Sequence, residues 1–331
     1  MKVDVGAVEA ELARMQRELT NSEVRTSLFN LVVMSPDAQR AMVDEALNYL
    51  LGKRAARVIH IVNNDQKESS LEVSARCFVD HEHKGVCFQE VVITNGADDA
   101  GGAPGSWIPL LVRDIPTYIL WLDRVSGREA LFEHVQSQAD KIIVDSDHCV
   151  ELGDDPGDLL ATLRTVAVEE GVPLADFSWK RLRPYQQLTA GAFDGEGRER
   201  WLDEIDRVEL RGLATVAANL FALWLAERLG WSRSGTTADH ERIVFRDVRG
   251  RSVEVVCENG EPGCDVAIAI HLTNDRVVEV TAGRNGCADV DYPGGETKHL
   301  VTIPSNGEIL LEEVDAVYAD DLYRDALTRT T

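Results

Sequence analysis

Residues 27–34 read SLFNLVVM, and this stretch decides the fold of the first half of the chain. The run is apolar but short for a helix, and Ser35–Pro36 closes it, so it predicts a buried strand. Residues 37–51 then predict a helix with Ser35 or Asp37 as its cap, and Arg57–Val62 repeats the buried-strand pattern. This order predicts a β-α-β unit.

The elements on either side extend this unit into a larger sheet. An amphipathic helix is expected over Val5–Leu19, because apolar residues recur there at three- and four-residue steps. Two strand patterns, Leu71–Val79 and Val86–Thr94, flank a polar turn and predict a hairpin. A strand, a helix and a strand are then predicted at Thr117–Leu122, Arg128–Gln138 and Lys141–Asp145. We therefore expect an α/β N-terminal domain with a mixed sheet flanked by helices.

The second half follows a different pattern. A helix ends near residue 170 and Gly171–Pro173 breaks the chain, so we predict two domains, residues 1–172 and 173–331. Helical material is expected as far as Trp231, and a final helix near Gly307–Leu327 is expected to cover one face of the sheet. Short β-like runs between them predict strands at Arg242–Asp247, Ser252–Glu258, Asp265–Leu272, Arg276–Ala282 and His299–Pro304. Turn residues separate these runs, which predicts an α+β C-terminal domain with an antiparallel sheet.

The chain is strongly acidic. Its 331 residues carry 57 acidic and 34 basic side chains, a formal net charge of −23. Such a charge repels nucleic acid and the anionic surface of a membrane, so we expect neither as a partner. An acidic surface favours encounter with a basic protein, although solubility alone accounts for it.

Three features predict a cytoplasmic protein. The six cysteines are scattered and form no CxxC pair, which is typical of a reduced, intracellular chain. The N-terminus has acidic residues at Asp4 and Glu9 and lacks the pattern of a signal peptide. The most apolar stretch, Leu213–Leu225, is shorter than the roughly 20 residues of a membrane span, so it predicts a core helix.

The sequence lacks the motifs of common catalytic sites. The loop Gly96–Gly105 has no lysine where a phosphate-binding loop needs one, and no GxGxxG follows a strand candidate. Gly230–Ser234 ends in serine where the nucleophile elbow of a hydrolase needs glycine. His81 and His83 share a short turn without a recognisable set of further metal ligands. We expect no catalytic residue, no metal and no cofactor, and interpret the chain as a non-enzyme.

Two cysteines are candidates for a redox pair. Cys257 and Cys264 bracket the turn 258–263 of a predicted hairpin, where facing positions on paired strands suit a disulfide. The alternative interpretation is that both are small core residues.

Four stretches carry more aromatic and polar residues than a core needs. They read RTSLFNLVV at 25–33, WIPLLVRDIP at 107–116 running into Leu120–Trp121, DFSWKRLRPYQQL at 176–188, and ALWLAERLGW at 222–231. In this order they resemble the signature stretches of the glucose-6-phosphate dehydrogenase assembly protein family (OpcA), and the resemblance covers most of the chain. Tyr185 and Gln186 stand where the family pattern has Trp and Arg.

The resemblance implies a non-catalytic partner protein. It would bind glucose-6-phosphate dehydrogenase, favour its active oligomer as an allosteric activator, and so support NADPH production in the oxidative pentose phosphate pathway. In some photosynthetic relatives, cysteines make this effect redox-dependent.

The predicted partner-binding residues come from two of these stretches. Trp, Tyr and Arg supply most binding hot spots, which favours exposed members of 176–188. The predicted contacts are Trp179, Arg181, Arg183 and Tyr185, with Arg25 and Asn30 beside the first strand. The structural alternatives are that Trp179 and Tyr185 join the two domains and that Arg25 and Asn30 satisfy backbone groups.

Two rival functions remain open at the level of the sequence. One is a metabolite sensor that binds a sugar phosphate or nucleotide through Gly96–Gly105. The other is a cryptic enzyme with an interdomain pocket formed by Asp145, His148 and Arg181.

Overall fold

The computed structural model describes residues 4–20, 27–64, 69–79, 85–95, 107–236, 241–258, 265–283, 285–316 and 318–330. The chain forms two compact units that alternate along the sequence. Unit 1 comprises Met1–Asp154, Val172–Ala175 and Ser305–Ala319; unit 2 comprises Asp155–Gly171, Asp176–Pro304 and Asp320–Thr331. The single domain boundary after residue 172 stays a prediction.

Unit 1 is built on a seven-stranded mixed sheet, as predicted. The strands are β1 (Phe29–Pro36), β2 (Ala56–Asn63), β3 (Ser70–Val79), β4 (Gly85–Asn95), β5 (Thr117–Trp121), β6 (Lys141–Val144) and β7 (Leu174–Asp176), in the spatial order β3-β4-β2-β1-β5-β6-β7. The pairs β1–β2, β1–β5, β2–β4 and β5–β6 are parallel, whereas β3 and β4 form the expected antiparallel hairpin. Strand β1 is buried from Phe29 to Ser35 in the middle of the sheet, which explains its continuous apolar run.

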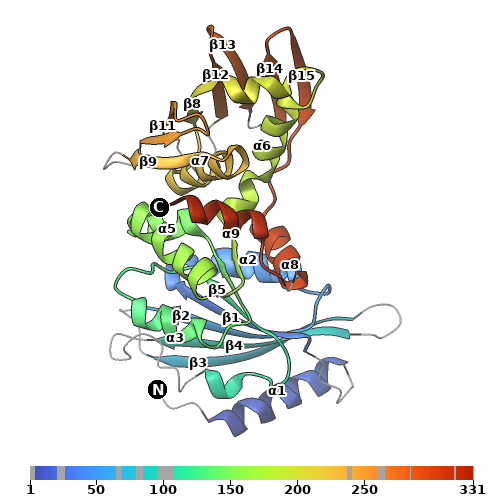
Figure 1. The fold of residues 1–331 in the computed structure, drawn as a ribbon. Coiled ribbons are helices and arrows are strands. Elements are labelled where there is room, and N and C mark those ends of the chain that lie inside the picture. Colours follow the sequence, from blue (N-terminus) through green and yellow to red (C-terminus); the bar gives the residue numbers. More distant parts are fainter. Residues whose placement is uncertain are drawn as a thin grey trace. The chain divides into compact units, whose positions relative to one another are not determined.

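Helices cover both faces of this sheet. The helices of unit 1 are α1 (Val5–Thr20), α2 (Arg40–Leu50), α3 (Glu129–Gln136), α4 (Ser146–Glu151) and α8 (Asn306–Asp315). Helix α1 lies on one face against β3 and β4, and α2 and α8 pack together on the other (Figure 1). The buried guanidinium of Arg57 in β2 holds α1, because it donates to Glu9 at 2.7 Å and to Gln89 at 2.8 Å.

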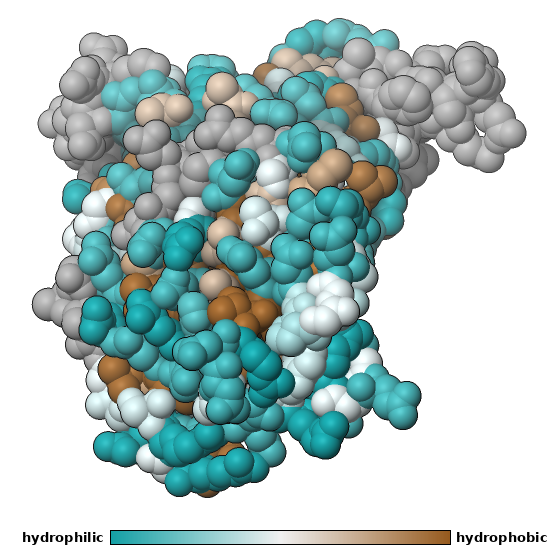
Figure 2. Space-filling model, turned by 90° about the horizontal axis from the view of Figure 1, so that it is seen from above, coloured by the Kyte–Doolittle hydropathy of each residue, from teal (hydrophilic) through white to brown (hydrophobic). Residues whose placement is uncertain are grey.

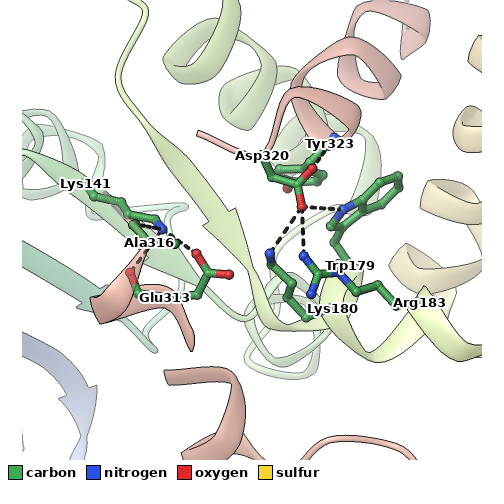
Figure 3. A network of polar contacts seen from close by, with 8 residues as sticks. All are labelled: Lys141, Trp179, Lys180, Arg183, Glu313, Ala316, Asp320 and Tyr323. Carbon is green, nitrogen blue, oxygen red and sulfur yellow. Dashed lines mark hydrogen bonds and ion pairs between the residues drawn. The ribbon is translucent and has the colours of Figure 1, made fainter. Parts of the chain in front are cut away.

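A buried ion pair fixes α8 in unit 1. The Lys141 ammonium in β6 pairs with the Glu313 carboxylate, and both side chains are almost fully buried. It also donates to the backbone carbonyls of Glu313 at 3.1 Å and Ala316 at 2.8 Å (Figure 3). One cation therefore satisfies a carboxylate and two carbonyls at the C-terminal end of α8.

Unit 2 contains an eight-stranded, mostly antiparallel sheet. Its strands are β8 (Ile205–Arg211), β9 (Ser232–Thr236), β10 (Arg242–Arg246), β11 (Ser252–Glu258), β12 (Val266–Leu272), β13 (Arg276–Ala282), β14 (Cys287–Tyr292) and β15 (Gly295–Leu300). They lie in the order β15-β14-β13-β12-β8-β11-β10-β9, and only β8–β11 among the paired strands described is parallel. The turn between β12 and β13 has left-handed backbone at Asn274 and Asp275, as a tight hairpin requires.

One face of this sheet carries a layer of helices. The helices of unit 2 are α5 (Pro156–Arg164), α6 (Phe177–Phe193), α7 (Thr215–Leu229) and α9 (Asp321–Leu327). Helix α6 packs against β13 and β14, while α7 packs against β11, α6 and α9. Every residue of α7 from Val216 to Ala226 is buried, which confirms the predicted core helix. Among the helices described, none has both the length and the hydrophobicity that crossing a bilayer requires.

Three predictions for the second half are wrong. Residues 205–211 form β8 instead of helical material, and β8 lies between β11 and β12. The last predicted strand, 299–304, is not formed, because β15 ends at Leu300; the β14–β15 hairpin over 287–300 was not predicted. The single final helix is two helices, and α8 packs on α2 of unit 1 instead of covering this sheet.

The surface of the protein is mostly polar on one face. Figure 2 shows mostly hydrophilic residues there, with hydrophobic residues in small separate groups. This distribution fits the excess of acidic side chains in the sequence.

The buried pair predicts that the same Lys→Met substitution lowers the free energy of unfolding much more at Lys141 than at an exposed lysine. Lys141→Met leaves the Glu313 carboxylate buried without its cation, so urea unfolding should show a loss of about 3–5 kcal/mol. Lys298→Met removes an exposed pair with Asp289, so its free energy of unfolding should stay close to that of the parent. Equal losses for the two variants would contradict a stabilising role for the buried pair.

Candidate functional site

The stretch 176–188 forms the start of α6, directly after the short strand β7. Asp176 is the N-cap of this helix, and its carboxylate accepts a hydrogen bond from the Ser178 amide at 2.9 Å. Its other oxygen accepts from the Tyr323 hydroxyl at 2.9 Å. Because Asp176 is fully buried, these two donors fix both the first turn of α6 and the position of α9.

The Asp320 carboxylate contacts three side chains on the first turns of α6 (Figure 3). One of its oxygens accepts from Trp179 Nε1 and from Lys180 Nζ, each at 3.2 Å, and lies 3.5 Å from the Arg183 guanidinium. Its other oxygen accepts from the Tyr323 amide at 3.2 Å and so caps α9. A single carboxylate therefore joins two helices that are far apart in the sequence.

The electrostatic balance at Asp320 favours the charged carboxylate. Burial alone would raise its pKa, but the charge of Lys180, the Tyr323 amide and the charge of Arg183 together lower it below the usual value. Trp179 adds packing, because its ring lies 5.3 Å from the Tyr323 ring and its side chain is only 2% exposed.

The predicted contacts on α6 differ in their exposure. Trp179 is buried, and partner contact at this residue stays a prediction. Arg183 is 40% exposed beside Asp320. Arg181 lies over the Phe177 ring at 5.8 Å, and both Arg181 and Tyr185 are partly exposed. Partner contact at these three residues stays a prediction.

The two predicted residues near β1 do not form part of this group. Asn30 is fully buried, and its side-chain amide exchanges hydrogen bonds of 2.9 Å with both the N–H and the carbonyl of Val112. It thus satisfies backbone groups, the structural alternative given above. Arg25 lies outside the described residues.

The hairpin proposed for the cysteine pair is not formed. Strand β8 lies between β11, which carries Cys257, and β12, so the strands on either side of the predicted turn are not neighbours. Cys257 is a buried free thiol whose pKa is raised to about 12, by burial first and by the charge of Glu241 second. Cys264 lies outside the described residues, and a redox role for the pair stays a prediction.

The carboxyl ends of the parallel strands in unit 1 hold buried polar pairs. Ser35 Oγ lies 2.8 Å from His60 Nε2, and Asn63 donates to Asp123 at 2.8 Å. Burial, and then the charge of Arg40, lower the pKa of His60 to about 4, so its imidazole is neutral at pH 7. Both side chains are buried, Ser35 fully and His60 to within 1%.

The structure describes the three residues of the predicted interdomain pocket but not the loop of the predicted metabolite sensor. Asp145 is the buried N-cap of α4, and His148 lies 3.1 Å from Glu151; both belong to unit 1, whereas Arg181 belongs to unit 2. The loop 96–105 lies outside the described residues. The residues described contain no group of three or more acidic, histidine or cysteine side chains arranged to hold a metal.

The far half of α6 lines a groove of about 600 Å³ in unit 2. Its lining residues are Pro184, Gln187, Leu188, Gly191, Ala192 and Arg198 on one side, and Val290, Tyr292, Thr297, His299, Leu300, Val301 and Thr302 on the other. The sequence prediction missed both this groove and Asp320. Asp320 is the N-cap of α9, and its partners on α6 lie about 140 residues earlier in the sequence.

The Asp320 network predicts a pH-dependent loss of stability. A carboxyl whose pKa is lowered on folding stabilises the native state above its ordinary pKa of about 4 and loses that contribution as pH falls through the lowered value. Asp320→Asn should therefore cost about 2 kcal/mol near pH 7, with the gap to the parent shrinking below pH 4.

The neighbouring Asp321 provides the control. It pairs only at the surface with Arg324, at 3.1 Å, so Asp321→Asn should change stability by less than about 1 kcal/mol. The measurement is urea unfolding from pH 3 to pH 8. A gap for Asp320→Asn that is the same at every pH would contradict the charge argument.

The cysteines should differ in reactivity. With a thiol reagent at pH 8 and peptide mapping of the label, exposed Cys287 should react quickly, whereas Cys257 and Cys149 should react only after denaturation. Rapid native labelling of Cys257 would show that its strand opens readily.

A solved structure has a similar fold over most of this chain. KijD10, a 3-ketoreductase from Actinomadura kijaniata in complex with NADP, superposes with a TM-score of 0.50 at 12% identity, covering 92% of this chain and 95% of that one. At the end of β1, Ser35 lies buried against His60, and Pro36 has no backbone N–H to donate to a phosphate.

The sequence comparisons agree on one family. A protein of Nostoc punctiforme named for the OxPP cycle, OpcA, is 30% identical over 256 residues, 71% of this chain and 53% of the relative. The OpcA of Synechococcus elongatus is 26% identical over 284 residues, 78% of this chain and 62% of the relative. The chain thus spans a little over half the length of these relatives.

Two family models match in succession along the chain. Residues 48–165 match the glucose-6-phosphate dehydrogenase subunit N-terminal domain, and residues 172–327 match the C-terminal domain of the same subunit. Together with the relatives, these matches confirm the resemblance seen in the four stretches: the chain belongs to the OpcA family of glucose-6-phosphate dehydrogenase subunits.

Proposed function

We propose that this chain is a non-catalytic assembly factor and allosteric activator of glucose-6-phosphate dehydrogenase. The observation that carries the proposal is the succession of two domain models, both described as parts of a subunit of that enzyme. In this role the chain acts in the cytoplasm and supports NADPH production through the oxidative pentose phosphate pathway.

The mechanism needs a difference in affinity between two states of the enzyme. A partner raises activity only if it binds the active oligomer more tightly than the inactive form, and coupling of about 1–3 kcal/mol changes that equilibrium about 5- to 150-fold. No nucleophile or proton donor is required of the partner itself. The partly exposed side chains of α6, Arg181, Arg183 and Tyr185, are the proposed contacts.

Two observations weigh against an enzyme despite the dehydrogenase-like fold. Pro36 at the end of β1 has no N–H to offer a pyrophosphate, and the Ser35–His60 pair is buried. A fold by itself does not carry a reaction, since function depends on the site.

The proposal is tested with the same organism's glucose-6-phosphate dehydrogenase. Titration with this protein should raise NADP reduction by about fivefold or more, or shift the enzyme to a larger species in sedimentation, and saturate at a fixed ratio. The protein alone should not reduce NADP with glucose 6-phosphate. If neither activity nor sedimentation of the enzyme changes, in oxidising or reducing buffer, the proposal fails.

A further inference from the structure

The groove of unit 2 lies where the helix layer of the sheet stops short of its edge. Ala288 and Val290 of β14 are buried on the face that carries α6. Their partners in register on β15, His299 and Thr297, are exposed, as are all six residues of that strand. Because paired residues point to the same face, α6 covers β14 and leaves the same face of β15 open.

Apolar residues lie on both sides of this opening, among polar ones. Leu188 and Pro184 line it from α6, and Val301 from the segment after β15. Leu300 is 88% exposed at the end of β15, among the most exposed large hydrophobic residues described. A volume of about 600 Å³ lies within the range of about 300–1,000 Å³ that protein pockets use to hold ligands.

The charge of the groove is opposite to that of the chain. Arg198 is the cationic side chain among its lining residues, and the described lining includes no carboxylate. The chain as a whole has 57 acidic side chains against 34 basic ones. Arg198 is also held in place, since its guanidinium lies 4.3 Å from the centre of the Tyr292 ring and donates to the Asp194 carbonyl at 2.8 Å.

We propose that this groove receives an apolar segment of glucose-6-phosphate dehydrogenase that carries a carboxylate, with the carboxylate beside Arg198. The inference rests on the proposed function and names the docking surface for it. The stretch 176–188, singled out in the sequence, then has two parts: its first turns are fixed by Asp320, and its far half forms the wall of the groove. Burial of apolar side chains supplies affinity, and the charge pair sets orientation.

Gly191 is a position at which a larger side chain can be introduced into the groove. It lines the groove in α6, and a Cβ added there meets no atom within 4 Å. Gly191→Trp should fill the groove and weaken binding of the dehydrogenase by about tenfold or more. Gly191→Ala adds only a methyl group and a better helix former, so its Kd should stay within about twofold of the parent.

The carboxylate is tested separately through Arg198. Arg198→Gln should weaken binding and make it less sensitive to salt, because a charge pair at the rim is lost. Val248→Ser is the control, since Val248 is an exposed apolar residue outside the groove lining. A salt dependence unchanged by Arg198→Gln would overturn the charge part of the proposal.

The measurements are Kd by calorimetry, thermal unfolding of each variant, and hydrogen exchange of residues 295–301 with and without the dehydrogenase. Protection of these amides on complex formation, with loss of affinity in Gly191→Trp but not in Gly191→Ala, supports the groove. If the parent binds but Gly191→Trp binds equally, or Gly191→Ala is equally weak, or residues 295–301 gain no protection, the groove is not the docking surface, although the proposed function stands. If the parent does not bind, both fail.

Discussion

The Asp320 carboxylate is the interaction on which the candidate site depends. It is shared by Trp179, Lys180 and Arg183, three residues on the first turns of α6, and by the backbone of α9. Since it lies in a mostly buried position, its loss would leave Lys180 buried without its carboxylate partner, and a buried charge without a partner is far more costly than an exposed one. The position of α6, and of the groove that its far half lines, follows from this contact.

The C-terminal segment also carries a second buried ion pair. Glu313 of α8 pairs with the buried Lys141 in unit 1, and seven residues later Asp320 pairs with α6 in unit 2. In each unit, a carboxylate from the C-terminal segment therefore pairs with a lysine on an element that comes earlier in the sequence. In both pairs the charges have their partners within the fold.

Local sequence patterns were enough to predict much of the fold. The run 27–34, the β3–β4 hairpin and the core helix α7 each carry their signal within a few residues, as continuous burial, alternation or turn chemistry. Strand β8 was missed because exposed Asp206 and Arg207 interrupt its apolar positions, and its place between β11 and β12 depends on long-range pairing. Asp320 could be predicted as a cap, but its partners on α6 could not, since local spacing contains no information about them. The fold also resembles that of a ketoreductase at 12% identity, and a shared fold does not by itself carry a function.

The most direct test of this account is a structure of the complex between this chain and the same organism's glucose-6-phosphate dehydrogenase, determined by electron cryo-microscopy. The account predicts density of the enzyme in the groove between α6 and β15, with an acidic side chain or terminus beside Arg198 and with Asp320 still bonded to Trp179 and Lys180. A complex in which the enzyme contacts only other surfaces, or in which the Asp320 network is broken, would contradict it.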